Sequence, residues 1–198
     1  MLIDDIKNYR TEEDTIIGIN YSKEYLELED IERIEFSDCT FDSCKFINCN
    51  ISKTSFIKCR FKNCDFSNSD LNEALLKYCN YDSTKFMGTT FIKTILRNTE
   101  FTNSHFPYTN FSDASIQSCI MASCELNETS LTHAKLGIKF KQCRLIRVNF
   151  ANSSLRGIDF TSNELESIIA NIVDIKGAIV NSTQALSLSG LLGIIIKD

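Results

Sequence analysis

The chain is poor in the side chains that most often carry catalysis. Its 198 residues include only two histidines and seven glycines, and the glycines form neither a phosphate-binding loop nor the G-x-S-x-G turn that exposes a nucleophilic serine. The nine cysteines contain no Cys-x2-Cys pair, which is the spacing typical of zinc sites. These absences predict a protein that is not an enzyme and has no catalytic residues, no cofactor and no metal site.

Long apolar runs are also missing. No run reaches the length of about 20 residues that a membrane-spanning helix requires. The first residues, Met1 to Asp5, contain neither a basic region nor a long apolar core, so they do not look like a signal peptide. We therefore expect a cytoplasmic protein that does not enter a membrane.

What the sequence does contain is a five-residue period. A large apolar residue occupies every fifth position from Phe36 to Leu136, and from Phe41 on a small residue stands two positions before each of these centres. A helix repeats its side-chain direction every 3.6 residues and a strand every 2, so neither can use a period of five. The chain must therefore turn once per repeat, as a repeat architecture does. The phenylalanine centres of this stretch are Phe36, Phe41, Phe46, Phe56, Phe61, Phe66, Phe86, Phe91, Phe101, Phe106 and Phe111.

One repeat, Ser69 to Glu73, shows the full pattern: a small residue, Asp or Asn, a central Leu or Phe, and two variable positions. This pattern resembles the pentapeptide-repeat family. The resemblance implies an all-β fold, a right-handed quadrilateral β-helix (pentapeptide-repeat solenoid) with four repeats per coil and a short C-terminal helix. We assign residues 1–30 to an acidic N-terminal cap, 31–182 to the β-helix, and 183–198 to a C-terminal helix and strand that form a dimer.

Stacking of the coils explains the cysteines. Coils at β spacing lie roughly 4.8 Å apart, so about 150 residues at twenty per coil predict seven to eight coils and a rod roughly 35 Å long. Every cysteine occupies the inward small position, where a buried thiol packs as a small apolar group. Residues such as Cys39 and Cys59 would stack within reach of a disulfide, but a cytosolic protein normally keeps its thiols reduced. We therefore expect nine reduced packing cysteines.

The period slips once, because Leu136 and the next centre, Phe140, are only four residues apart. The five-residue step then resumes through Val180. Gly137 lies inside the shortened step, and we expect it to take the unusual backbone angles that a missing residue demands. The simplest interpretation is a tolerated deletion at a corner, and a functional kink is the alternative.

The first 30 residues differ from the repeats in charge. They hold nine acidic and three basic residues, a net charge of −6. The open end of a solenoid must be capped. We expect this segment to cap the first coil, as a short helix or an irregular start that leads into strands at 19–21 and 25–28.

The last residues also leave the repeat pattern. Ser182 and Thr183 offer an N-cap, residues 184–192 predict a short helix, and Gly193 suits the position after its end. We expect a strand at 194–196 to follow.

This C-terminal segment resembles one particular group within the pentapeptide-repeat family. Residues 174–180, followed by Gln184-Ala185-Leu186 and by residues 191–194, resemble the C-terminus of the Qnr and MfpA type quinolone-resistance proteins. The resemblance implies a two-fold homodimer, and binding to a type II topoisomerase, DNA gyrase or topoisomerase IV, on the saddle where DNA would lie. Protection from quinolones or other gyrase poisons follows from that. The expected dimer interface is Leu186, Leu188, Leu191, Leu192, Ile194 and Ile196.

The charge of the rod argues against simple DNA mimicry. Residues 31–180 hold sixteen acidic and seventeen basic residues, a net charge of +1, whereas duplex DNA carries about one negative charge per 1.7 Å of its axis. Shape mimicry and contact through specific side chains remain as alternatives, unless the acidic N-terminal cap supplies the field.

One wall combines apolar, aromatic and basic residues over three consecutive coils. Such a patch can mark a partner site, although single exposed apolar residues are normal on any surface. The sharper hypothesis is that the patch faces an acidic protein surface. Its residues are Ile57, Lys58, Leu75, Lys77, Tyr78, Ile95 and Arg97.

Two functions follow from these patterns. The first is a topoisomerase-protecting protein, and the alternative is a cytoplasmic scaffold that binds an unrelated protein partner. Direct binding of nucleic acid is not expected, because no basic groove with interleaved aromatic residues is present. His105 and His133 both take outward positions on different walls, where we expect solvated side chains. The fold by itself cannot choose between the two functions, since one scaffold hosts many.

Overall fold

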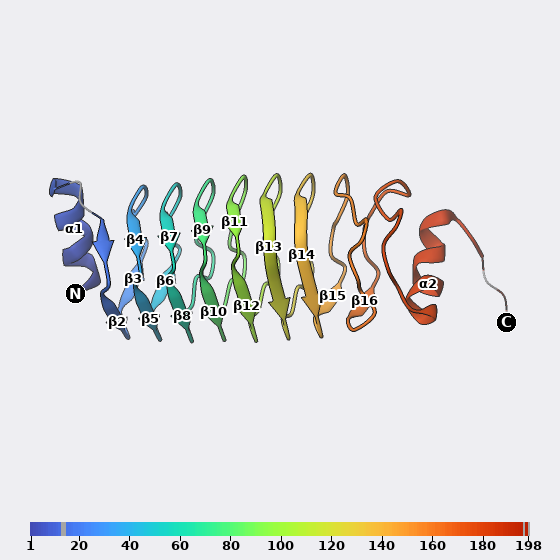
Figure 1. Cartoon of the computed structure of the whole chain (residues 1–198), viewed down its shortest axis with the longest axis horizontal. Coiled ribbons are helices and arrows are strands. Elements are labelled where there is room, and N and C mark those ends of the chain that lie inside the picture. The colour runs from blue at the N-terminus through green and yellow to red at the C-terminus, as the bar shows by residue number, and fades with distance from the viewer. Residues whose placement is uncertain (13–14, 196, 198) are drawn as a thin grey trace.

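The computed structural model describes residues 1–12, 15–195 and 197. The chain forms a parallel β-solenoid of about eight coils, drawn out as a rod with a helix at each end (Figure 1). This confirms the predicted right-handed quadrilateral β-helix with a short C-terminal helix. No helix in the described part of the chain is long and apolar enough to cross a membrane.

The strands are short because the chain turns after each repeat. They are β1 (Ile16–Ile17), β2 (Asn20–Ser22), β3 (Tyr25–Glu27), β4 (Glu35–Ser37), β5 (Thr40–Asp42), β6 (Lys45–Ile47), β7 (Ser55–Ile57), β8 (Arg60–Lys62), β9 (Leu75–Lys77), β10 (Asn80–Asp82), β11 (Ile95–Arg97), β12 (Glu100–Thr102), β13 (Ser115–Ala122), β14 (Lys135–Lys141), β15 (Arg144–Ile146) and β16 (Glu164–Glu166). The helices are α1 (Leu2–Glu12), α2 (Ser182–Ser189) and the 3₁₀ turn η1 (Gly190–Leu192).

Each strand pairs in parallel with the strand one coil away. Phe41 lies opposite Phe61, and Tyr81 lies opposite Phe101, which is a separation of twenty residues in both cases. This register confirms four repeats per coil. We call the stack of β4, β7, β9 and β11 the first wall, that of β5, β8, β10 and β12 the second wall, and the side bearing β3, β6, β15 and β16 the third wall. The first two walls join into one sheet through β13.

Stacked rings fill the inside of the rod. Along the second wall, the ring centroids of Phe41 and Phe61 are 4.7 Å apart and those of Phe61 and Tyr81 are 4.4 Å apart, with nearly parallel planes. Rings of adjacent walls meet edge-on, as Phe61 and Phe66 do at 5.6 Å and 68°. Offset stacks and edge-to-face contacts are the favourable geometries of aromatic pairs. The five-residue period therefore builds an aromatic core that is continuous from Tyr21 to Phe111, and the centres from Ile116 to Leu136 continue it with aliphatic side chains.

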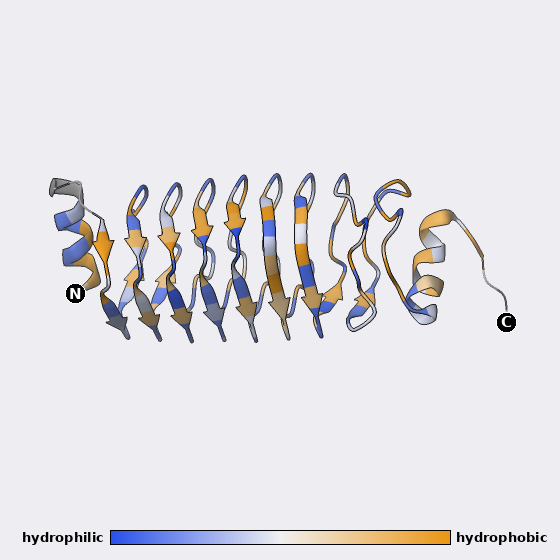
Figure 2. Ribbon diagram, viewed as in Figure 1, coloured by the Kyte–Doolittle hydropathy of each residue, from blue (hydrophilic) through white to orange (hydrophobic). Residues whose placement is uncertain are grey.

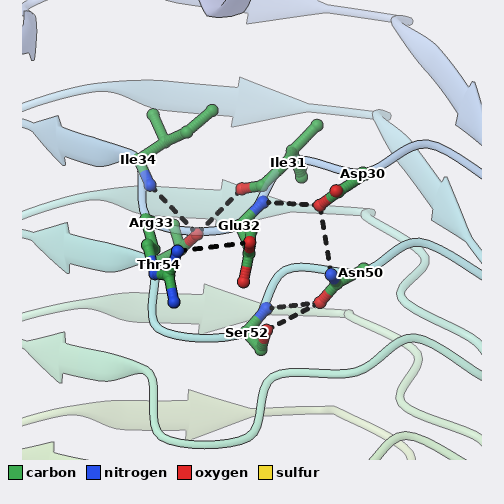
Figure 3. Close-up of polar contacts among 8 residues, drawn as sticks. All are labelled: Asp30, Ile31, Glu32, Arg33, Ile34, Asn50, Ser52 and Thr54. Carbon is green, nitrogen blue, oxygen red and sulfur yellow. Dashed lines mark hydrogen bonds and ion pairs between the residues drawn. The ribbon is translucent and has the colours of Figure 1, made fainter. Parts of the chain in front are cut away.

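Side chains at the small inward position hold the corner turns. Thr54 Oγ1 donates a hydrogen bond to the carbonyl oxygen of Ile31 at 2.9 Å (Figure 3). Asn50, which lies between the small residue Cys49 and its centre, adds a second bond to the turn, because its Oδ1 accepts the N–H of Ser52 at 3.2 Å. The acceptor of the Thr54 bond is the carbonyl of a centre residue twenty-three positions earlier, as it is for Cys59 and Phe36, and a buried carbonyl without a partner is costly. The small residue thus satisfies the backbone as well as filling space, which explains why Ser, Thr and Cys recur there.

One residue at most corners takes a left-handed backbone conformation. It stands two positions after the centre, and where it is not glycine its φ lies between 49° and 63°. A left-handed residue costs about 1–2 kcal/mol for most side chains and less for Asn and Asp. Lys58 and Tyr78 both sit at such corners on the edge of the first wall, where they are exposed.

The shortened step removes one of these corner residues. Leu136 pairs with Ile116 at the usual separation of twenty, whereas Ile138 pairs with Cys119, nineteen positions away. The prediction that Gly137 takes unusual backbone angles is wrong, because its φ is not left-handed. A Cβ at Gly137 would instead lie 2.8 Å from the carbonyl oxygen of Ile116. Glycine is needed there because the two backbones approach closely once the corner is cut short.

The N-terminal cap is helical. Leu2 and Ile6 of α1 are buried against the first coil, and the Tyr21 hydroxyl donates a hydrogen bond to Asp5 Oδ2 at 2.9 Å. Strands β2 and β3 lie within one residue of the predicted strands at 19–21 and 25–28. The additional strand β1 pairs with β4, so it extends the first wall toward the helix. Burial of the apolar face of α1 covers the open end of the core.

The C-terminal helix begins at a capping box. Asn181 Oδ1 accepts the N–H of Gln184 at 2.9 Å, and Gln184 Oε1 accepts the N–H of Asn181 at 3.0 Å. The predicted N-cap at Ser182 and Thr183 is therefore wrong by one residue, because the reciprocal pair needs the N-cap three positions before Gln184. The buried Gln184 amide also donates to the carbonyl oxygens of Phe160 and Asn163, both at 2.8 Å. Gln184 thereby ties the helix to the last complete coil.

Beyond the helix, the predicted end and the predicted strand have different outcomes. Gly193 has a φ of 70° and follows η1, as its predicted role after the helix requires. Ile194 and Ile195 have no regular secondary structure, so the strand predicted there is wrong for these two residues, and Ile196 lies outside the described residues. A strand needs a neighbouring strand for its backbone hydrogen bonds, and the described part of the chain offers none at this end.

The nine cysteines are all buried and unbonded to one another. Burial raises the pKa of Cys49 and of Cys119, because the thiolate is poorly solvated inside the rod. We expect none of the nine to react with a thiol reagent within minutes at pH 8 in the native protein, and all nine to react after denaturation. Titration with a chromogenic disulfide reagent measures both numbers. Rapid labelling of folded protein would contradict the inward packing of the small positions.

Candidate partner surface

The fold brings the predicted patch residues together. Leu75 lies between Ser55 and Ile95 in one outward column of the first wall, and Lys77 lies between Ile57 and Arg97 in the next. All of these side chains are half-buried or exposed, while the centres between the columns are buried. In the ribbon coloured by hydropathy, β7, β9 and β11 carry orange segments, which include the buried centres, and the second wall beside them is more hydrophilic (Figure 2).

Two patch residues interact directly. The Lys77 ammonium lies 5.3 Å from the centroid of the Tyr78 ring, which is a cation–π distance. Tyr78 occupies the exposed corner between the first and second walls. The contact holds a cation and an aromatic ring side by side at the edge of the patch.

A groove of about 870 Å³ continues from the patch across this corner. It runs along the rod over four coils, and each coil contributes a corner residue and a residue of the second wall. Because the groove starts with Asp38 and ends with Glu100, an acidic side chain lies at each end. Its polar and aromatic lining residues are Asp38, Thr40, Lys58, Arg60, Tyr78, Asn80, Asn98 and Glu100.

The cations of this surface are free of ion pairs. Within the described part of the chain, none of Lys58, Arg60, Lys77 and Arg97 has an acidic group in ion-pair contact. A partner that brings carboxylates to the patch would therefore not have to displace an existing ion pair. This is a surface suited to an acidic protein face, with apolar contacts from Leu75 and Ile95 at its centre.

The third wall is organised differently. Arg144 lies between two carboxylates, with Nε 2.9 Å from Glu164 Oε2 and a terminal nitrogen 3.6 Å from Glu125 Oε1. His105 Nδ1 lies 3.2 Å from Glu125 Oε2, so one ladder in which nitrogen groups and carboxylates alternate spans four coils. Exposed pairs of this kind contribute little stability.

The sequence did not predict the groove. Asp38 is a corner residue of the first wall, whereas Arg60 and Glu100 belong to the second wall, so a patch on one wall does not contain all three. The sequence does contain a signal for the groove. In each coil, the corner residue that stands two positions after a first-wall centre and the residue two positions further on flank the same edge of the rod. Considering the residues of both walls along this edge together would have predicted the groove.

A second exposed surface lies at the C-terminal end. Leu188 and Leu191 of the predicted dimer interface pack against the core, whereas Leu186, Leu192 and Ile194 are exposed. Figure 2 shows hydrophobic residues along α2 and the chain after it. The last turns of the solenoid expose further apolar side chains, which sequence reasoning did not include. They are Ile169, Ile172, Val173 and Ile179.

The repeat, the register and the buried centres define a class: a parallel β-solenoid built from five-residue units. A family model described as the pentapeptide repeat region matches residues 34–111 and 95–169. The chain belongs to the pentapeptide-repeat family. No curated protein matches the sequence significantly.

Several solved pentapeptide-repeat structures resemble the chain over most of its length. QnrB1, described as a plasmid-mediated fluoroquinolone resistance protein, has 23% sequence identity and a TM-score of 0.43, over 91% of this chain and 100% of that one. HetL, involved in heterocyst differentiation regulation in the cyanobacterium Nostoc sp. strain PCC 7120, has 15% identity and a TM-score of 0.25, over 90% and 96%. Rfr23 from the cyanobacterium Cyanothece 51142 has 12% identity and a TM-score of 0.31, over 90% and 99%.

Proposed function

We propose that this protein is a cytoplasmic homodimeric rod that binds a type II topoisomerase, DNA gyrase or topoisomerase IV, and protects it from quinolones or other gyrase poisons. The C-terminal segment carries the proposal. It resembles the corresponding segment of the Qnr and MfpA type proteins in sequence, and it closes the last coil while leaving Leu186 and Ile194 exposed. A two-fold contact between such ends would cover both apolar surfaces and double the rod.

The mode of binding that we propose relies on particular side chains. The repeat region carries a net charge of +1, so it cannot reproduce the field of a DNA duplex. The first wall instead offers free cations and apolar side chains next to a groove. We propose that Lys77 and Arg97 meet carboxylates of the topoisomerase, while Leu75 and Ile95 make the apolar contact.

The same surface also supports the second candidate, a scaffold for an unrelated acidic protein. The observation that favours it is the patch itself, because free cations and apolar residues over three coils suit many acidic partners. The two candidates differ in the partner and share the binding surface. An experiment on topoisomerases therefore separates them.

The deciding measurement is DNA supercoiling by purified gyrase, with and without ciprofloxacin, over a range of concentrations of this protein. We expect protection from the drug, or inhibition of supercoiling, at micromolar concentrations. Relaxation or decatenation by topoisomerase IV is assayed in parallel. No effect on either enzyme from the native host well above micromolar concentration would favour the scaffold.

The double variant Lys77→Glu, Arg97→Glu tests the binding surface. Reversing two charges places like charges opposite an acidic partner, and we expect the topoisomerase effect to weaken at least tenfold. The matched control Lys45→Glu, Lys85→Glu makes the same charge change on the third wall and should behave as wild type. An unchanged or stronger effect of the first-wall variant would show that binding does not depend on these two cations, and it would refute this mode of binding.

A further inference from the structure

The shortened step at Gly137 opens a notch in the side of the rod. The coils on either side of the notch keep their corner residues. These are Ser118 in the preceding coil and Gly157 in the following coil, and both have a left-handed backbone conformation. Between them the corner is cut back by one residue. The resulting cavity has a volume of about 420 Å³ and is lined by both neighbouring coils.

The notch uncovers part of the core. Every centre from Ile31 to Leu165 is buried except Leu136, which is half-buried and lines the notch. Ile120, Ile138 and Ile158 complete the apolar lining. Among the described residues β14 pairs with β13 alone, so the sheet ends at this strand, and the coil that follows does not close over it as the others do.

Two cations stand at the rim. Lys139 and Arg156 both line the notch, and neither has an acidic group in ion-pair contact within the described part of the chain. The stem of Arg156 lies against Gly177, where a Cβ would be 3.1 Å from its Cγ. Three glycines, Gly137, Gly157 and Gly177, follow one another up this corner, so none of these positions carries a side chain.

An adjoining cavity of about 340 Å³ extends the notch along β14. It adds Lys141 to the lining and one acidic residue, Asp159. The Asp159 carboxylate accepts hydrogen bonds from the N–H and the hydroxyl of Thr161, at 2.8 and 2.7 Å, so it is engaged within its own turn. A ligand in the notch or in the adjoining cavity would therefore meet mainly positive charge.

We propose that this notch is a binding site for an amphipathic organic anion, a small molecule with a flat or linear apolar body and one carboxylate or sulfonate group. The apolar body lies over Leu136, Ile120 and Ile158, and the anionic group lies between Lys139 and Arg156. The volume of the notch, about 420 Å³, falls in the range of ligand pockets. Such pockets are mostly apolar, with a few polar groups that fix the orientation of the ligand. The site is independent of the topoisomerase proposal, since it lies outside the first-wall patch.

The chemistry excludes other small ligands. An organic cation would meet two like charges at the rim, and a purely hydrophobic molecule would gain nothing from Lys139 and Arg156. A strongly polar anion such as inorganic phosphate would leave the apolar floor exposed to water. Selectivity for a molecule that is both apolar and anionic is therefore the distinguishing property of the site.

The test uses 8-anilinonaphthalene-1-sulfonate as the probe and measures its fluorescence and, by calorimetry, its affinity for the full chain. We expect one site per chain with a Kd of roughly 10–100 μM, the order expected for a ligand of this size. N-phenyl-1-naphthylamine, which lacks the sulfonate, should bind at least tenfold more weakly. Equal affinity for the neutral compound would overturn the proposal.

Variants locate the probe. Lys139→Gln with Arg156→Gln should weaken binding at least tenfold, while the control Lys53→Gln with Lys93→Gln on another face should not. Ile120→Trp should fill the notch and abolish binding, and Leu186→Asp at the C-terminal surface should leave it intact. Unchanged affinity in the first variant and in Ile120→Trp, with circular dichroism showing native folds, would place the probe elsewhere and refute the site.

Discussion

Replacing Phe66 by Ala should lower the free energy of unfolding by about 3–5 kcal/mol, the usual loss for a buried aromatic side chain. Phe66 is fully buried and stacks between Phe46 at 4.7 Å and Phe86 at 5.4 Å. The cavity would lie in the middle of the rod, where rigid coils on both sides cannot collapse into it. Equilibrium denaturation by guanidinium measures the change.

Two further variants calibrate that result. Met87→Ala removes an exposed side chain from the neighbouring coil and should change stability by less than about 0.5 kcal/mol. Cys64→Phe should be at least as harmful as Phe66→Ala, because the inward small position has no room for a ring. A loss below about 1 kcal/mol for Phe66→Ala would show that the stacked core contributes far less than its burial indicates.

The second large effect concerns the oligomeric state. We expect the wild type to be a dimer at tens of micromolar, and the double variant Leu186→Asp, Leu192→Asp to be a monomer. Leu186 is 59% exposed and Ile195 is 84% exposed. A single chain therefore leaves apolar surface at this end in contact with water, and a second copy could cover it. Charges placed there would be buried without partners in a two-fold contact. Sedimentation velocity distinguishes the two states directly.

The choice of residues matters for this experiment. Leu188 and Leu191 pack against the last coil, so Leu191→Asp would loosen the cap as well as any dimer contact. Truncation after Val180 would remove Gln184, which holds two carbonyl groups of the final coil, and we expect aggregation. The matched control Met87→Asp, Tyr108→Asp places the same two charges at exposed positions far from the C-terminus. A wild-type monomer at tens of micromolar would contradict the dimer and weaken the topoisomerase proposal with it.

The sequence predicted the architecture because each repeat is a local unit. The distance from a small residue such as Thr54 to its centre, Phe56, is fixed within one turn, and it decides which side chains face inward. Because each coil has twenty residues, residues at the same position of successive coils stack on one another. The place of Phe36 over Phe56 therefore follows from the local repeat alone. Burial of the nine cysteines follows from the same period.

The candidate surfaces were predicted less well. The first-wall patch was found because its columns follow the period, but the groove beside it crosses a corner and joins residues of two walls. The C-terminal segment has no period, and its pattern of leucines did not separate the partly buried Leu188 and Leu191 from the exposed Leu186. That separation depends on where the capping box at Asn181 sets the helix against the last coil.

The five-residue period by itself determined the solenoid, its inward columns, its coil repeat and the place of the deletion. Only the tertiary structure decided what the deletion does. A missing residue in a sequence does not say whether the corner bulges, kinks or is cut back, because the answer depends on the backbones of the two coils beside it. Here the close approach of Gly137 to the Ile116 carbonyl, and the end of strand pairing at β14, leave Leu136 partly uncovered. Contacts between coils, which no local pattern encodes, set that outcome.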